Sequence, residues 1–177
     1  MAERVSLRPY AESDLWVLER TLGDPSQMVH LNGPESPEKL RKRHKMFVAM
    51  SADQHAGCMY TITLGPENAP VGNVGYWETE VDGQKGWESG WFVLPEFQGK
   101  GVATAAMRML VSRIAKLDRQ FLYASPSVDN GPSNAICRKL GFVLTKEMDS
   151  EYPPGSPLRI NVWRLDLKAL EAADQAA

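Results

Sequence analysis

Residues 88–104 read Glu-Ser-Gly-Trp-Phe-Val-Leu-Pro-Glu-Phe-Gln-Gly-Lys-Gly-Val-Ala-Thr, and this stretch decides the fold of the chain. Its aromatic and branched residues predict a strand, which Pro95 ends. A glycine turn follows at residues 98–101, and apolar residues then recur at helical spacing from Val102 to Ile114. The pattern therefore predicts a strand, a tight turn and the N-terminus of a helix.

This turn has the chemistry of an anion-binding site. The first N–H groups of a helix have no partner inside the helix and carry the positive end of its dipole. Gly99 and Gly101 let the backbone approach a ligand closely. The glycine spacing is neither that of a P-loop nor that of a dinucleotide-binding turn. The pattern thus predicts a phosphate cradle, residues 98–104, without naming the ligand.

Two motifs resemble those of the GNAT family, the acyl-CoA-dependent N-acetyltransferases. Residues 98–103, Gln-Gly-Lys-Gly-Val-Ala, resemble the family's Q/R-x-x-G-x-G/A signature. Residues 130–142, Asn-Gly-Pro-Ser-Asn-Ala-Ile-Cys-Arg-Lys-Leu-Gly-Phe, resemble its N-x-x-S … K-L-G-F segment. Residues 5–10 are similar to the opening strand of the branch that acetylates the N-termini of ribosomal proteins. Both motifs stand in the family's order, and the resemblance covers nearly the whole chain.

The resemblance implies an α/β architecture, the GNAT acyl-CoA N-acyltransferase fold. Its mixed, mostly antiparallel sheet has a splay between central strands and is flanked by helices. Hydrophobic patterning predicts the same order: a strand, two helices, three antiparallel strands, a helix, a strand, a helix and two strands. We expect one domain at residues 1–170 and a short tail, helical or disordered, at residues 171–177.

Two local expectations concern the edges of this fold. The last two strands are expected at residues 142–147 and 161–167, with a proline-rich loop at residues 150–157 between them. The second helix is expected to begin after Ser36 and to carry residues 41–43, Arg-Lys-Arg, on a solvated face.

Composition excludes several classes of protein. The chain has 177 residues, of which 43% are hydrophobic, and a net charge of −2, so we expect neither a nucleic-acid nor a membrane partner. Its only cysteines, Cys58 and Cys137, are too few for a disulfide framework or a zinc site. No signal peptide is visible at the N-terminus. We therefore expect no metal and a cytoplasmic location.

The resemblance implies acetyl-CoA as the acyl donor. The cradle's backbone amides would hold the CoA pyrophosphate, and the strand before it would hold the pantetheine arm and offer oxyanion donors. Asn130 would bind the pantetheine amide or cap a helix. Lys139 would meet the 3′-phosphate or lie on a solvated helix face. The expected CoA contacts are Phe92, Val93, Gln98, Gly99, Lys100, Gly101, Val102, Ala103, Thr104, Asn130, Ser133 and Lys139.

Amine acetylation requires a base for the attacking amine and benefits from an acid for the leaving thiolate. Glu88 is the expected base, because it lies on the strand ahead of the cradle. Glu78 and Glu80 are rivals, and a plain surface glutamate is the alternative. His30, His44 and His55 are each expected to be surface residues rather than bases.

The expected acid follows from the resemblance. Many relatives carry a tyrosine seven residues after the motif's asparagine, where this chain has Cys137, expected to be a small buried apolar residue. In the ribosomal branch the serine that corresponds to Ser133 has been given the acid role. A hydrogen bond at the start of a helix is the alternative role for Ser133.

Two loops are candidates for the acceptor's side of the site. Residues 23–35 carry His30, and residues 149–159 carry Glu151 and Tyr152. We expect these three residues to contact the acceptor: acidic Glu151 would attract a cationic amine, and Tyr152 offers it an aromatic face. The alternative is that both loops are plain connectors.

The sequence thus predicts an N-acetyltransferase that moves acetyl from acetyl-CoA to a primary amine by direct attack in a ternary complex. The amine is a protein N-terminus or a small molecule, and a homodimer is left open. Two alternatives remain: transfer of another acyl group such as succinyl, and a non-catalytic acyl-CoA-binding regulatory protein.

Overall fold

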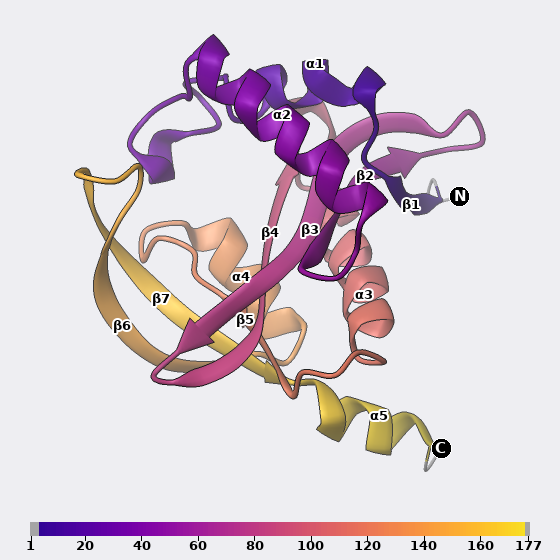
Figure 1. Cartoon of the computed structure of the whole chain (residues 1–177), viewed down its shortest axis with the longest axis vertical. Helices are drawn as coiled ribbons and strands as arrows, with labels where there is room; N and C mark the ends of the chain where they lie inside the picture. The colour runs from indigo at the N-terminus through magenta and orange to yellow at the C-terminus, as the bar shows by residue number, and fades with distance from the viewer. Residues whose placement is uncertain (1–3, 176–177) are drawn as a thin grey trace.

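The computed structural model describes residues 4–175 and contains one seven-stranded sheet in the order β1-β2-β3-β4-β5-β7-β6 (Figure 1). The strands are β1 (Val5–Pro9), β2 (Gly57–Leu64), β3 (Ala69–Val81), β4 (Gln84–Val93), β5 (Phe121–Ala124), β6 (Val143–Glu151) and β7 (Pro157–Asp166). The helices are α1 (Leu15–Arg20), α2 (Pro37–Ala52), α3 (Val102–Ile114), α4 (Gly131–Lys139) and α5 (Leu167–Gln175). Three short 3-10 turns are η1 (Glu12–Asp14), η2 (Val29–Leu31) and η3 (Pro95–Phe97).

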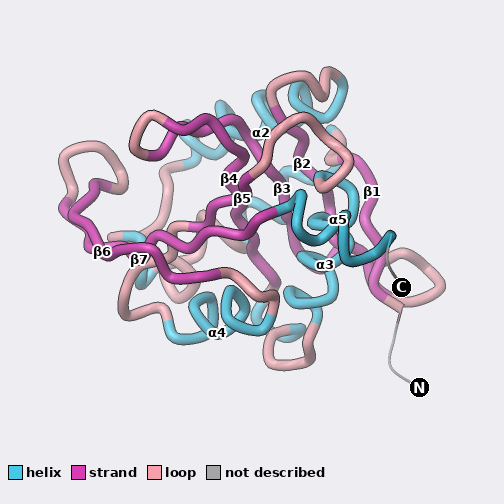
Figure 2. Tube along the Cα trace, turned by 90° about the horizontal axis from the view of Figure 1, so that it is seen from below, coloured by secondary structure: helices cyan, strands magenta, loops and turns pink. Residues whose placement is uncertain are grey.

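The sheet separates two main hydrophobic cores, and a small third cluster lies on β5 and β7. Figure 2 shows α2 on one side of the strands and α3 and α4 on the other. The larger core joins the sheet to α3 and α4 through residues such as Leu110 and Cys137, both fully buried. The smaller core joins the opposite face to α1 and α2 through Leu18 and Phe47. The two faces of the central strands therefore meet different surroundings.

The sheet opens between β4 and β5, its only parallel neighbours among the described strands. The ten-residue strand β4 pairs with β3 over its whole length but with β5 at only two positions, Trp87 with Leu122 and Glu88 with Tyr123. Beyond Glu88 the two strands part. The predicted α/β fold, its order of elements and its splay between central strands are confirmed.

Local signals explain most element boundaries. Ser36 caps α2, where its hydroxyl accepts from the Lys39 N–H at 3.3 Å. The β3–β4 turn is made by Asp82 (φ 52°) and Gly83 (φ 78°), both left-handed, as the hairpin geometry requires. Helix α5 begins at Leu167 and extends into the segment predicted to be a tail, whose last residues, 176–177, lie outside the described part.

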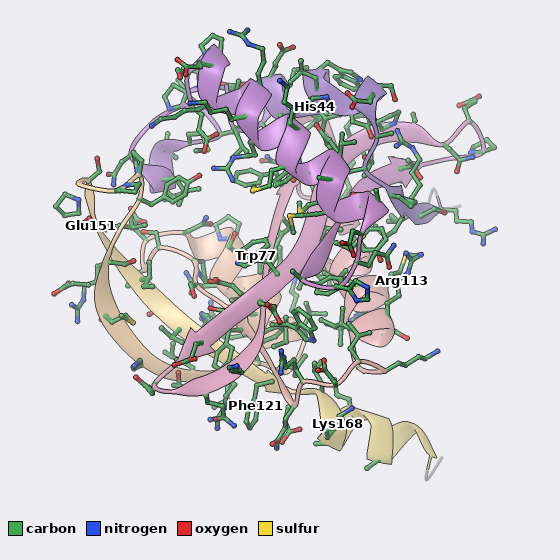
Figure 3. The ribbon with its side chains drawn as sticks, in the orientation of Figure 1. His44, Trp77, Arg113, Phe121, Glu151 and Lys168 are labelled. Atoms are coloured by element: carbon green, nitrogen blue, oxygen red, sulfur yellow. The ribbon has the colours of Figure 1, made fainter. Side chains whose placement is uncertain are left out.

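Three expectations about the fold were wrong. The β6–β7 hairpin is longer than predicted, because strand pairing continues to Glu151 and Pro157 and leaves a tip of only residues 152–156. Arg43 is not on a solvated face, since its guanidinium pairs with Glu35. His44 is buried: its Nδ1 lies 2.9 Å from the Tyr10 hydroxyl and its Nε2 lies 3.0 Å from Glu12 Oε2, and Figure 3 labels it on α2, beside α1.

Candidate active site

The predicted phosphate cradle is built from left-handed glycines. Gly99 has a φ of 71° and Gly101 a φ of 79°, values that other residues adopt only with strain. A Cβ atom added at either position would meet no atom within 4 Å. The turn therefore needs glycine for its backbone and leaves open space beside it.

Helix α3 begins at this turn without a side-chain cap. Its N-cap residue is Gly101, and the first N–H with a helical partner is that of Ala105, which donates to Gly101 O at 2.9 Å. In contrast, Asn130 caps α4 through its Oδ1, which accepts from the Ser133 N–H at 3.1 Å. The open N–H groups at Val102, Ala103 and Thr104 make the start of α3 a site for an anion.

The strand before the cradle offers backbone groups to the splay. Leu94 N donates to Val71 O at 2.8 Å, so its pairing partner lies on β3. Successive backbone N–H groups of a strand point alternately toward its two neighbours. The N–H of Phe92 therefore points toward β3, whereas the N–H groups of Trp91 and Val93 face the splay. The sequence pointed to both Phe92 and Val93 as oxyanion donors. This register favours Val93, joined by Trp91.

The loop between β5 and α4 is held by a buried asparagine that the sequence analysis missed. Asn134 Nδ2 donates to the carbonyls of Ser127 (3.0 Å) and Asn130 (2.8 Å). Its Oδ1 accepts from Asn161 Nδ2 and from Trp163 Nε1. These four bonds fix the loop against β7, next to Ser133 in the first turn of α4. The Asn130 side chain takes the capping role that was one of its two expected roles.

Glu88, the predicted base, lies where the splay begins. It is half-buried, and its Oε2 accepts a hydrogen bond from Trp77 Nε1 at 3.1 Å. Trp77, labelled in Figure 3, packs against the core that the sheet shares with α1 and α2. Glu88 is its direct partner across β3 and β4, so the two side chains share this face. Glu78 is paired with Trp87 and belongs to the opposite face, as does Glu80. Geometry therefore favours Glu88 over both rivals.

The rival glutamates line a different surface. An open cleft of about 320 Å³ lies beside Glu78, Glu80 and Arg119, toward the β3–β4 hairpin end. Arg119 also pairs with Glu78 at 2.9 Å. This cleft contains none of the residues of the cradle or of the acceptor's side.

The segment between α1 and α2, residues 21–36, crosses the site and is called here the strap. At its start, Arg20 forms two hydrogen bonds with Glu96 of η3, at 2.8 and 3.0 Å. Gln27 Oε1 accepts from Gln98 Nε2 at 2.7 Å, and the same nitrogen donates to Val93 O at 2.8 Å. The strap is therefore tied to the cradle itself.

The other end of the strap is tied to the β5–α4 loop and the β6–β7 tip. His30 Nδ1 lies 3.1 Å from Asp129 Oδ1, and Asn32 Nδ2 donates to the carbonyls of Tyr152 (2.8 Å) and Pro157 (3.0 Å). Figure 1 shows the tip of the hairpin lying beneath this part of the chain. His30 and Tyr152, predicted from two separate loops, are thus brought onto one side of the splay.

A partly buried ion pair anchors the hairpin tip to the strap and α2. Arg43 pairs with Glu35, and the Tyr152 hydroxyl lies between them, 2.7 Å from Glu35 Oε1 and 3.0 Å from Arg43 Nη2. Burial raises the pKa of Glu35, but the hydrogen bonds from Arg43 and Tyr152 outweigh it, so the pKa is lowered overall. Burial raises the pKa of Tyr152 to about 12. The cluster therefore carries no net charge, and its three side chains are held by hydrogen bonds to one another.

Other predicted residues lie at the periphery. Glu151 is exposed at the hairpin tip (Figure 3), where its Oε2 accepts from the Gly155 N–H at 2.8 Å. Lys100 and Lys139 are exposed near the two CoA motifs. Cys137 is fully buried, and burial raises its pKa to about 12, which leaves a thiol rather than a nucleophilic thiolate. Among residues 4–175, no group of three His, Cys, Asp or Glu side chains could hold a metal ion.

Solved structures share this fold. An acetyltransferase of the GNAT family from Bacillus anthracis is 19% identical, with a TM-score of 0.75 over 95% of this chain and 98% of that one. An acetyltransferase from Salmonella typhimurium that modifies the N-terminal serine of ribosomal protein L7/L12 is 22% identical, with a TM-score of 0.74 over 92% and 94%. A spermidine N-acetyltransferase from Vibrio cholerae, solved with CoA and spermine, is 16% identical, with a TM-score of 0.75 over 92% and 95%.

A sheet that opens beside an uncapped glycine turn defines the class of acyl-CoA-dependent acyltransferases. The family model described as an acetyltransferase (GNAT) domain matches residues 4–143. The chain belongs to this family and is an acyl-CoA-dependent acetyltransferase, with acetyl-CoA as its acyl donor. No helix in the described part of the chain is long and apolar enough to cross a membrane.

Proposed function

We propose that this enzyme transfers the acetyl group of acetyl-CoA to a primary amine by direct attack in a ternary complex, with Glu88 as the base. One observation carries the proposal. Glu88 is held at the opening of the splay by a single indole N–H and has no cationic partner among the described residues. A carboxylate in this state can attract an ammonium group and then accept its proton, directly or through one water.

The chemistry follows from the two halves of the site. The neutral amine attacks the thioester carbonyl carbon, a C–N bond forms, and the carbonyl oxygen gains negative charge. The backbone N–H of Val93, with that of Trp91 beside it, is positioned on the splay to stabilise this oxyanion. Collapse of the intermediate breaks the C–S bond. The nitrogen, which became positively charged on attack, then gives up one proton. Ser133, on the first turn of α4, is proposed to pass a proton to the departing thiolate and to regain one from that nitrogen, so that the products are the neutral amide and the CoA thiol.

The charges around Glu88 narrow the acceptor class. Glu35 and Asp129, on the strap's side, already have basic partners in Arg43 and His30. Asp24 and Glu151 form no ion pair within the described part of the chain: Asp24 accepts from Ser26, and Glu151 accepts from the Gly155 N–H at the exposed hairpin tip. We propose an acceptor whose one cationic amine meets Glu88, such as a peptide N-terminus or a small monoamine, and the panel below includes a polyamine to test this choice. The two buried, unpaired cysteines support a cytoplasmic location.

The test is release of the CoA thiol from acetyl-CoA with a panel of acceptors: short peptides with free N-termini, amino acids, monoamines and spermidine. Glu88→Gln should lower kcat about a hundredfold or more, while the affinity for acetyl-CoA stays similar. Glu78→Gln is the matched control, because its carboxylate belongs to the other face of the sheet. Wild-type turnover by Glu88→Gln would remove Glu88 as the base.

A further inference from the structure

The residue that holds Glu88 lies directly across the sheet. Trp77 on β3 is the register partner of Glu88 on β4, and its indole N–H donates to Glu88 Oε2 at 3.1 Å, the one hydrogen bond to this carboxylate among the described side chains. The second oxygen, Oε1, has no hydrogen-bond partner among the described side chains. One oxygen is therefore fixed and the other is free to meet the acceptor.

Two glycines make room for aromatic rings beside Glu88. A Cβ atom at Gly90 would lie 2.9 Å from Trp77 Cη2, so the indole occupies the space of a missing side chain. A Cβ atom at Gly86 would lie 2.7 Å from Tyr123 Cε2. Both glycines stand two residues from Glu88 and share its face of the sheet. Glycine inside a strand lowers the stability of the strand, and here the close approach of an aromatic ring explains both Gly86 and Gly90.

We propose that Trp77 is a positioning residue for Glu88, which it holds through its indole N–H, and that Gly90 provides the space in which the indole lies. This proposal rests on the proposed role of Glu88. A free glutamate side chain samples many rotamers, and ordering it in one of them costs conformational entropy. The bond from Trp77 orders the carboxylate before the acceptor arrives, as proximity catalysis requires.

The sharpest test removes the N–H and keeps the ring. Incorporation of β-(3-benzothienyl)alanine at position 77 replaces the indole N–H by sulfur with almost the same shape. We expect kcat to fall about tenfold, within the range for one hydrogen bond to a charged group. The KM for acetyl-CoA and the melting temperature should stay at wild-type values. If Trp77 only filled space, kcat would stay at its wild-type value as well, so the fall in kcat is the result that shows positioning.

Two further variants separate the effect of the space that the Trp77 ring occupies from the effect of its hydrogen bond to Glu88. Trp77→Phe also removes the donor and should lower kcat at least as much. Gly90→Ala keeps the indole but displaces its ring by contact with Cη2, so we expect a smaller fall, about threefold, in kcat. In the Glu88→Gln background, the benzothienyl substitution should have no further effect on kcat, because the group that it positions is gone.

The outcomes distinguish this proposal from the proposed function. If the benzothienyl enzyme keeps full activity while Glu88→Gln has a much lower kcat, the positioning role of Trp77 is overturned and Glu88 remains the proposed base. Full activity of both variants would overturn the base, and the positioning role with it. A fall in kcat that is equally large in the Glu88→Gln background would also overturn the proposal, because Trp77 would then act on something else.

Discussion

The proposed CoA half and the proposed acceptor half of this site are built in opposite ways. The cradle of the CoA half depends on one continuous stretch, the end of β4, η3 and the first turn of α3, and on the left-handed backbone of Gly99 and Gly101. The acceptor half depends on side chains that meet across the chain: Gln27 and Gln98 are 71 residues apart, and Asn32 and Pro157 are 125 apart.

This difference separates what is common to the reaction from what selects its substrate. A cradle of backbone N–H groups recognises a phosphate whatever side chains surround it. The wall around the strap consists of polar and ionic side-chain contacts, and replacing one partner of such a contact changes shape and charge together. Substitutions in the two halves should therefore affect different kinetic constants, and the predictions below test that separation.

The largest effect is expected in the cradle. Gly101→Asp forces a side chain into a left-handed position, at a cost of about 1 kcal/mol, and places a carboxylate where the pyrophosphate should lie. We expect acetyl-CoA affinity to fall at least about a hundredfold by calorimetry.

A matched control removes the ambiguity of backbone strain. Gly65 has a φ of 74° and open space at its Cβ position, but it lies in the β2–β3 turn. Gly65→Asp should cost similar stability and leave acetyl-CoA affinity intact. Equal loss of binding in both variants, or undiminished binding by Gly101→Asp, would contradict the cradle.

A smaller effect is expected at the hairpin tip. Tyr152→Ala removes the hydroxyl that bridges Glu35 and Arg43 and loosens the tip from the strap. We expect the acceptor KM to rise about tenfold, with acetyl-CoA affinity unchanged, as for loss of a hydrogen bond to charged groups. Steady-state kinetics with the best acceptor of the panel measures both constants.

Glu151→Ala sharpens this result, because the two residues are neighbours with different surroundings. Glu151 is exposed and bonded to the Gly155 N–H, so its loss should affect the acceptor KM less than the loss of Tyr152. A larger effect of Glu151→Ala would restore the sequence-based view that this carboxylate attracts the amine. If Tyr152→Ala lowers only the melting temperature, the tip is structural.

The same contrast explains what the sequence could reveal. The cradle was predictable because its strand, turn and helix leave signals within 17 residues: a strand-ending proline, left-handed glycines and helical spacing. The full length of β6 was not, because this edge strand is exposed on both faces and therefore lacks alternating hydrophobicity. Its end, from Met148 to Glu151, is mostly polar, so the predicted strand stopped at residue 147 and residues 150–157 were predicted to be a loop.

Other residues were missed for identifiable reasons. His44 lies between Leu40 and Phe47 at helical spacing, so the pattern contained a signal that the polarity of histidine obscured. Arg43 and Glu35 gave no signal, since their meeting depends on how the strap folds back on α2. Asn134 sits inside a motif that the resemblance covers, yet only the packing of α4 on β7 shows its four hydrogen bonds.

The smallest predicted effect lies where the two halves touch. Gln98 belongs to the cradle's motif, but its side chain bonds both Val93 O and Gln27 of the strap, so Gln27→Ala frees the strap from the cradle while leaving the backbone amides in place. Because this contact is exposed, we expect only about a twofold to threefold rise in acceptor KM and no change in acetyl-CoA affinity. Arg159→Ala, which breaks the exposed contacts to Glu147 and Asp149 on the hairpin, is the control and should change neither constant. A loss of acetyl-CoA affinity in Gln27→Ala would show that the strap supports the cradle as well, and the two halves would then have to be treated as one coupled unit.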